Sequence, residues 1–414
     1  MKPVFLLFLS IMTAAISNAQ IKTDPWLKEL LEQQASPLLK SVLEQPEVYQ
    51  YQLIYTEIKR DAHQHPSFVN HYLNVDRNRY FNPASTVKMP VAFAALEKLN
   101  GLGAKITPQT SMLTDSAFSG QTAVTGDATS ENGLPSIAHY IKKIFLVSDN
   151  DAYNRLYEFV GQKTLNEQLW KKGYKDIRIT RRFVPMNSEE NRHTNPIRFV
   201  KNGQTLFTQP AAYSNVQFRF PATKILVGKG HWDKNDSLIN TPMDFTEHNN
   251  LPLEDGHLLL RSVLFPGSVP SKQRFHLTED NYRMLYTYMS ELPYESRFPA
   301  YDTSEFFSSY TKFFFFRAGK EGIPDYIRVF NKAGWSYGFL TDYCYVVDFK
   351  NKVEFMLSAT IYVNKDGILN DNKYEYEEIG YPFFKEAGQI IYNHELHKKK
   401  TIVPDLSRWK LTYR

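Results

Sequence analysis

The sequence predicts an α+β fold in which an antiparallel sheet of about five strands is flanked by terminal helices and joined to an all-α part. Strand-like segments rich in β-branched and aromatic residues lie near both ends of the chain, and the readable elements between them are mostly helical. The composition supports a large core, since 42% of the 414 residues are hydrophobic, with 29 Phe and 26 Tyr among them.

The first nineteen residues are predicted to be a signal peptide. Lys2 precedes an apolar run from Val4 to Ile16, and the small residues Ser17 and Ala19 follow. The run is shorter than the ~20 residues that a bilayer crossing needs, and no later segment is long and apolar enough. We therefore expect an exported chain, periplasmic or secreted, without a membrane span.

Charge and cysteine content narrow the class of protein further. Lys and Arg number 49 against 44 Asp and Glu, a balance that does not favour nucleic-acid binding. Cys344 is the single cysteine, so an intramolecular disulfide is impossible, and its place in an aromatic strand indicates a buried core residue rather than a nucleophile.

We expect a discontinuous sheet domain formed by residues 20–80 and 300–414. Asp24 and Ser36 each precede a proline and an apolar pattern of helical period, which predicts two short helices. Two strands are expected to follow, over Tyr49–Arg60 and Phe68–Val75.

Residues 81–299 are predicted to form a mainly helical domain, with a polar insertion at about 198–235. A helix is expected to begin at Ser85 and to end at Asn100-Gly101. Further helices are expected over Leu134–Val147, Asp151–Val160, Lys163–Lys172, Leu253–Leu264 and Thr278–Leu292. The strands that complete the sheet are expected over Tyr326–Asn331, Phe339–Phe349 and Val353–Val363, and a last helix over Tyr381–His397.

Ser85 and Lys88 lie one helical turn apart at the start of the predicted helix. A lysine whose pKa is lowered by burial can accept the hydroxyl proton of a serine, and a helix N-terminus favours developing negative charge. Taken alone, the motif is more often an N-cap serine followed by a solvated lysine. Ser309 and Lys312 repeat the same spacing.

Two further patterns follow in the sequence. Ser148-Asp149-Asn150 lies in a tight turn between two predicted helices, where it can either cap a helix or face a cleft. Lys332-Ala333-Gly334 precedes Trp335 at a predicted strand, and its small residues let a substrate approach the backbone. An exposed charge at a sheet edge is the alternative interpretation of Lys332.

Together these patterns resemble the serine β-lactamases of class A and their penicillin-binding relatives, in which Ser-x-x-Lys, Ser-Asp-Asn and Lys-x-Gly occur in this order. The resemblance extends over about residues 49–392. It implies that Ser85 is acylated, that Lys88 accepts or relays its proton and that Ser148 protonates the leaving nitrogen. Asn150 would hold the amide side chain of the substrate and Lys332 would attract its carboxylate. The N–H groups of Ser85 and Trp335, beside Gly334, would form the oxyanion hole.

The chain departs from this family at two places. Ala333 lacks the hydroxyl usual in the third motif. In the loop that supplies the deacylating glutamate, Arg182 and Pro185 fit the family pattern but Val184 occupies the position of the glutamate. Either hydrolysis of the acyl-enzyme is slow, or Glu189 or Glu190 takes over as the base.

The sequence thus predicts an exported serine hydrolase that acts on a β-lactam or related amide and needs no cofactor. A D-alanyl-D-alanine peptidase acting on peptidoglycan-derived peptides, and a penicillin-binding sensor without turnover, are the alternatives. A metal site is not expected, because His63 and His65 lie in a polar loop and His394 to His397 falls one residue short of the zinc-protease motif.

Overall fold

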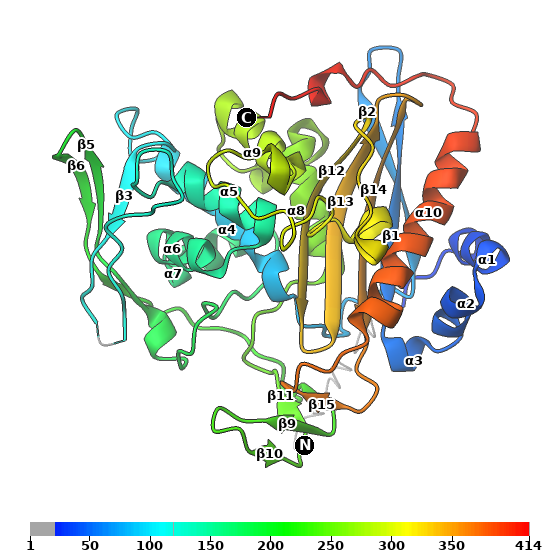
Figure 1. The fold of residues 1–414 in the computed structure, drawn as a ribbon, viewed down its shortest axis with the longest axis horizontal. Helices are drawn as coiled ribbons and strands as arrows, with labels where there is room; N and C mark the ends of the chain where they lie inside the picture. Colours follow the sequence, from blue (N-terminus) through cyan, green and yellow to red (C-terminus); the bar gives the residue numbers. More distant parts are fainter. Residues whose placement is uncertain (1–20, 119, 414) are drawn as a thin grey trace, which may run out of the picture.

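The structure is a computed structural model that describes residues 21–118 and 120–413 (Figure 1). The predicted signal peptide, residues 1–19, lies outside the described residues. Within them, no helix combines the length and apolar character that a bilayer crossing needs.

The predicted antiparallel sheet of five strands is confirmed, and the fold is α+β. Strands from both ends of the chain pair in the order β12-β13-β14-β1-β2. Their bounds are Gln52–Arg60 for β1, Pro66–Leu73 for β2, Ile327–Ser336 for β12, Phe339–Asp348 for β13 and Val353–Tyr362 for β14.

Helices cover both faces of this sheet (Figure 1). One face carries α1 (Pro25–Gln34), α2 (Pro37–Leu43) and α10 (Tyr381–His397), and the short α3 (Pro46–Tyr49) precedes β1. The other face packs against α8 (Leu253–Leu264) and α9 (Glu279–Ser290). Asp24 and Ser36 cap α1 and α2 as their positions before proline predicted.

The helical part extends from α8 and α9 away from the five-stranded sheet (Figure 1). It contains α4 (Lys88–Asn100), α5 (Ile137–Val147), α6 (Asn150–Val160) and α7 (Gln162–Lys171). Helix α4 is buried along nearly its whole length and packs against α5, α6 and α7. One apolar core joins these helices to the inner face of the sheet, and a second core lies between the outer face and α10. Ser85 stands where the helical part meets the sheet.

The region of the predicted insertion contains short strands that the sequence did not reveal. Strands β5 (Ile197–Lys201) and β6 (Gln204–Gln209) extend a sheet that begins with β3 (Ser111–Thr114). Two smaller sheets of shorter strands lie at the bottom of Figure 1. They comprise β8 (Leu226–Val227) with β11 (Met243–Asp244), and β9 (Gly230–Trp232) with β10 (Leu238–Ile239) and β15 (Ile368–Leu369). Strands of two or three residues are too short to show alternation.

Candidate active site around Ser85

Ser85 lies in a short 3-10 turn, Ala84–Val87, which leads directly into α4. The approach is strained, since buried Ala84 adopts a left-handed φ of 44°. Two hydrogen bonds hold the turn: Ala84 N–H donates to Asn82 Oδ1 at 2.8 Å, and Thr86 Oγ1 donates to the Pro83 carbonyl at 2.6 Å. This turn therefore holds Ser85 just before the first residue of α4. Backbone strain of this kind is often found at functional sites.

Lys88 is completely buried at the first residue of α4, one turn after Ser85. Its Nζ donates to the Ser148 carbonyl and, at 2.6 Å, to Asn150 Oδ1, and it lies 4.9 Å from the ring centre of Phe183. Burial, reinforced by the nearby Lys332 ammonium, lowers the pKa of Lys88 well below its usual value. This shift favours the neutral amine, which is the form of Lys88 that can accept a proton.

The turn at Ser148 places a second hydroxyl group beside Lys88. Ser148 caps the end of α5 with a left-handed φ of 62°, and Asp149 caps the start of α6 by accepting from the Ala152 N–H at 2.8 Å. The hydroxyl of Ser148 accepts from Lys332 Nζ at 2.9 Å, and Lys88 Nζ lies 3.4 Å from it. The structure therefore brings the Ser-Asp-Asn turn and both predicted lysines together.

Lys332 projects from β12, which continues past its predicted end at Asn331 through Ser336. Pairing of Ser336 with Phe339 of β13 extends the strand across residues of low β-propensity. Lys332 is 1% exposed rather than solvated, and burial lowers its pKa to about 7 despite the opposing charge of Asp342. Near neutral pH, the charged and neutral forms of Lys332 are therefore both present.

Gly334 touches the Ser85 turn with its backbone. A Cβ added at Gly334 would lie 2.7 Å from the Ser85 nitrogen and 2.8 Å from the Thr86 nitrogen. The ring of Trp335 packs instead against Tyr310 and Phe313, so the Trp335 backbone is what remains for the site. Ala333 is buried in the outer core, which explains why an apolar residue stands at this position.

A buried polar cluster beside Lys332 was missed by the sequence analysis. Lys312 Nζ donates to Asn331 Oδ1 at 2.6 Å and to the Val329 carbonyl at 3.0 Å, and Asn331 Nδ2 donates to Asp342 Oδ1 at 2.8 Å. Burial lowers the pKa of Lys312 to about 7 and raises that of Asp342 to about 6. The aspartate inside the apolar strand Phe339–Asp348 was the signal that could have revealed the cluster.

The loop after α7 contains Val184 at the position where the resemblance led us to expect a glutamate. Arg182 is buried and bonds Glu158 at 2.7 Å, the Phe183 N–H donates to Asn154 at 2.8 Å, and the Phe183 ring lies over Lys88. The sequence analysis did not single out Phe183, because its contact with Lys88 arises from the packing of two distant segments.

Glu189 and Glu190 are not brought to Ser85. Glu189 lies 3.4 Å from His193 and accepts from Tyr213 at 3.3 Å. Glu190 accepts from the Asn187 N–H at 2.7 Å. Neither carboxylate contacts Lys88 in the described part of the chain.

The competing candidates lie elsewhere. Ser309 is buried, and its Oγ has no hydrogen-bond partner among the described residues, while Lys312 points into the cluster beside β12. Cys344 is buried in β13, and burial raises the pKa of its thiol well above the usual value, as expected for a core residue. His65 lies in an exposed loop, where its Nδ1 is 3.1 Å from Asp61 Oδ2. None of its described contacts involves Ser85.

Part of the chain matches a known protein family. Residues 39–216 match the sequence profile of the β-lactamase enzyme family. The matched segment contains Ser85, Lys88, the Ser148 turn and the Val184 loop, whereas Lys332 lies beyond it. No curated protein matches the chain.

Solved structures of β-lactamases are similar in fold. One from Xanthomonas campestris is 12% identical, with a TM-score of 0.46, and the alignment covers 86% of this chain and 96% of the other. One from Burkholderia ambifaria is 14% identical, with a TM-score of 0.46 and coverage of 87% and 98%. Through residues 39–216 the chain is similar to the β-lactamase enzyme family, and this match supports a serine hydrolase of the β-lactamase type.

Proposed function

We propose that Ser85 attacks a β-lactam or a related amide and forms an acyl-enzyme that is released slowly. The observation that carries the proposal is the buried Lys88, which lies one turn from Ser85 and contacts Ser148 and Asn150 but no carboxylate among the described residues. Such a site has a base for acylation and none for activating water.

Acylation proceeds in this proposal by three linked proton and charge movements. Neutral Lys88 accepts the Ser85 proton while Ser85 Oγ bonds to the carbonyl carbon. The oxyanion then accepts hydrogen bonds from the N–H groups of Ser85 and Trp335. Ser148, next to both lysines, donates its proton to the leaving nitrogen and is reprotonated from Lys88, so the proton balance closes.

Substrate recognition follows from the residues on the two sides of Ser148. The charged form of Lys332 attracts a substrate carboxylate, and Asn150 holds an amide of the acyl side chain. Gly334 lets β12 pack directly against the turn that carries Ser85. These contacts suit a β-lactam and equally suit the end of a peptide, so the shared class is a carboxylate-bearing amide.

Release of the acyl group is the slow step in this proposal. Val184 offers no proton acceptor, and the Phe183 ring lies over Lys88 on the side of that loop. Glu189 and Glu190 are held by His193, Tyr213 and Asn187. This favours a penicillin-binding protein with little turnover over a fast lactamase, and a peptidase that transfers its acyl group to an amine remains the second candidate.

The proposal is tested by intact mass measured over time after mixing with a penicillin. We expect the mass of one penicillin to add to each chain and to persist for many minutes, together with a single stoichiometric burst from a coloured cephalosporin. Continuous colour release would contradict slow deacylation. A lack of both adduct and burst would reject β-lactam acylation and leave the peptidase, which a D-alanyl-D-alanine peptide assay would detect by released alanine.

The preference for a substrate carboxylate is expected to depend on pH. Because Lys332 is charged below its pKa of about 7 and neutral above it, the labelling rate of a penicillin relative to its methyl ester should fall roughly tenfold from about pH 6 to about pH 8. Taking the ratio removes the contribution of Lys88, which acts on both compounds. The Lys332→Arg variant keeps its charge, so its ratio should stay level. A level ratio in the unaltered protein would contradict the role of Lys332.

We further propose that the mature chain works outside the cytoplasm after removal of residues 1–19. The apolar run and the small residues before Gln20 support this. N-terminal sequencing of the protein recovered from the periplasm or the medium would test it.

A further inference from the structure

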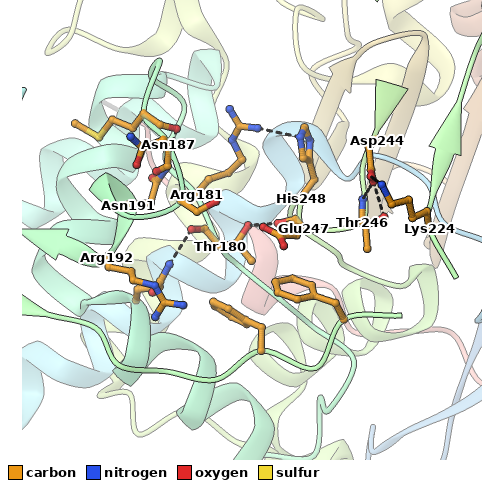
Figure 2. Close-up of a pocket in the computed structure, with 15 residues that line it drawn as sticks. Thr180, Arg181, Asn187, Asn191, Arg192, Lys224, Asp244, Thr246, Glu247 and His248 are labelled. Carbon is orange, nitrogen blue, oxygen red and sulfur yellow. Dashed lines mark hydrogen bonds and ion pairs between the residues drawn. The ribbon is translucent and has the colours of Figure 1, made fainter. Parts of the chain in front are cut away.

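A cavity with a volume of about 660 Å³ lies beside the loop that contains Val184 (Figure 2). It is open to solvent on one side and is lined by Gln162, by the loop from Thr180 to Arg192 and by residues 218–224 and 244–248. None of Ser85, Lys88, Ser148 or Lys332 lines it. The volume falls within the range of ~300 to 1,000 Å³ that is typical of small-molecule sites.

Guanidinium groups give the cavity a positive lining. Figure 2 shows Arg181 and Arg192 on the two sides of Thr180. Arg181 Nη1 lies 3.1 Å from His248 Nε2, and Arg192 Nη1 donates to the Ser214 carbonyl at 2.8 Å. In each case one nitrogen of a group with five N–H donors is engaged, so the lining holds further donors for an anion.

The other charged groups leave this positive character in place. Lys224 and Asp244 pair with each other at 3.3 Å, and Glu247 is the remaining acid of the lining. Burial and the neighbouring Arg181 lower the pKa of His248 to about 4, so His248 is neutral at neutral pH. The two arginines therefore outweigh the single unpaired carboxylate.

The remaining wall supplies an apolar surface and an unused acceptor. The rings of Phe218 and Phe220 have centres 5.7 Å apart and both line the cavity. Gln162, 2% exposed, donates to the Thr180 carbonyl at 2.8 Å through Nε2, but its buried Oε1 has no partner among the residues described here. Buried acceptors are nearly always satisfied, so a donor is missing at this point.

We propose that this cavity binds a small organic anion that carries an aromatic ring and an N–H or O–H donor. The anionic group lies between Arg181 and Arg192, the ring packs on Phe218 and Phe220, and the donor bonds Gln162 Oε1. The site is separate from acylation, so the ligand is bound and not cleaved.

Fluorescence titration with 8-anilinonaphthalene-1-sulfonate tests the proposal, because this probe combines a sulfonate, aromatic rings and one N–H. We expect saturable binding of one probe per folded chain and equal binding to the Ser85→Ala variant, which separates this site from the proposed function. N-phenyl-1-naphthylamine, which lacks the sulfonate, should bind at least about tenfold more weakly.

Variants locate the bound probe. Arg181→Gln and Phe218→Leu should each weaken binding about tenfold, and Arg181→Lys should recover part of the loss. Arg219→Gln is the matched control, because Arg219 is exposed on the same segment and does not line the cavity. Absence of saturable binding, or equal affinity in the Arg181→Gln and Arg219→Gln variants, would overturn the proposal. Circular dichroism of each variant verifies folding.

Discussion

Exchanging Ser85 for alanine is expected to abolish the penicillin adduct, with a fall in labelling rate of at least ~10⁴-fold. The reason is chemical, since no other described hydroxyl lies one turn before a buried lysine that contacts the Ser148 turn. Intact mass after mixing with a penicillin measures the effect. The fold should be unchanged, because the removed oxygen belongs to a half-buried side chain.

Ser309→Ala is the matched control, since Ser309 and Lys312 repeat the spacing of Ser85 and Lys88. Labelling should be retained, because Ser309 is buried and Lys312 is bonded to Asn331. If the adduct survives in the Ser85→Ala variant and disappears in the Ser309→Ala variant, the nucleophile has been assigned to the wrong serine.

Replacing Gly334 with alanine is expected to slow acylation by roughly a hundredfold. The added Cβ would lie 2.7 Å from the Ser85 nitrogen and 3.1 Å from the Pro83 carbonyl oxygen, and both neighbours are backbone atoms that must move. A displacement of up to ~1 Å at a nucleophile lowers rates by about this factor. Overpacking should also lower the free energy of unfolding by about 1 to 3 kcal/mol.

Gly322→Ala provides the comparison, since Gly322 is exposed and a Cβ there meets no atom within 4 Å. Labelling rates by stopped-flow and denaturant unfolding should be unchanged for this variant. An unaltered labelling rate in the Gly334→Ala variant would mean that the contact between β12 and the Ser85 turn is not needed for acylation.

Hydrophobic periodicity and turn residues were sufficient to predict most of the longer helices and strands. The caps at Asp24 and Ser36, the helix Leu253–Leu264 and the helix Tyr381–His397 were found at their predicted bounds, because local patterns determine them. The strand β12 was predicted too short, since its last residues are held by pairing with β13. Pairing between distant segments leaves no local pattern to read.

The sequence likewise indicated some residues of the site and not others. The order of Ser-x-x-Lys, Ser-Asp-Asn and Lys-x-Gly indicated Ser85, Lys88, Ser148 and Lys332 before any contact was known. The structure brings the side chains of Lys88, Ser148 and Lys332 together, one turn after Ser85. Phe183 over Lys88 and the contact of Gly334 with the Ser85 turn depend on how separate elements pack. The cavity beside Arg181 combines four segments of the chain, so sequence spacing could not indicate it.

The polar cluster beside β12 has a consequence for how folded molecules meet one another. β12 is the outermost strand of its sheet, and Lys312 and Asn331 bind along its free edge through the Val329 and Thr311 carbonyls. An open edge recruits strands from other chains, and a segment that covers the edge, as residues 311–312 do here, opposes such recruitment. The same residues that surround Lys332 thereby protect the protein from self-association through its sheet.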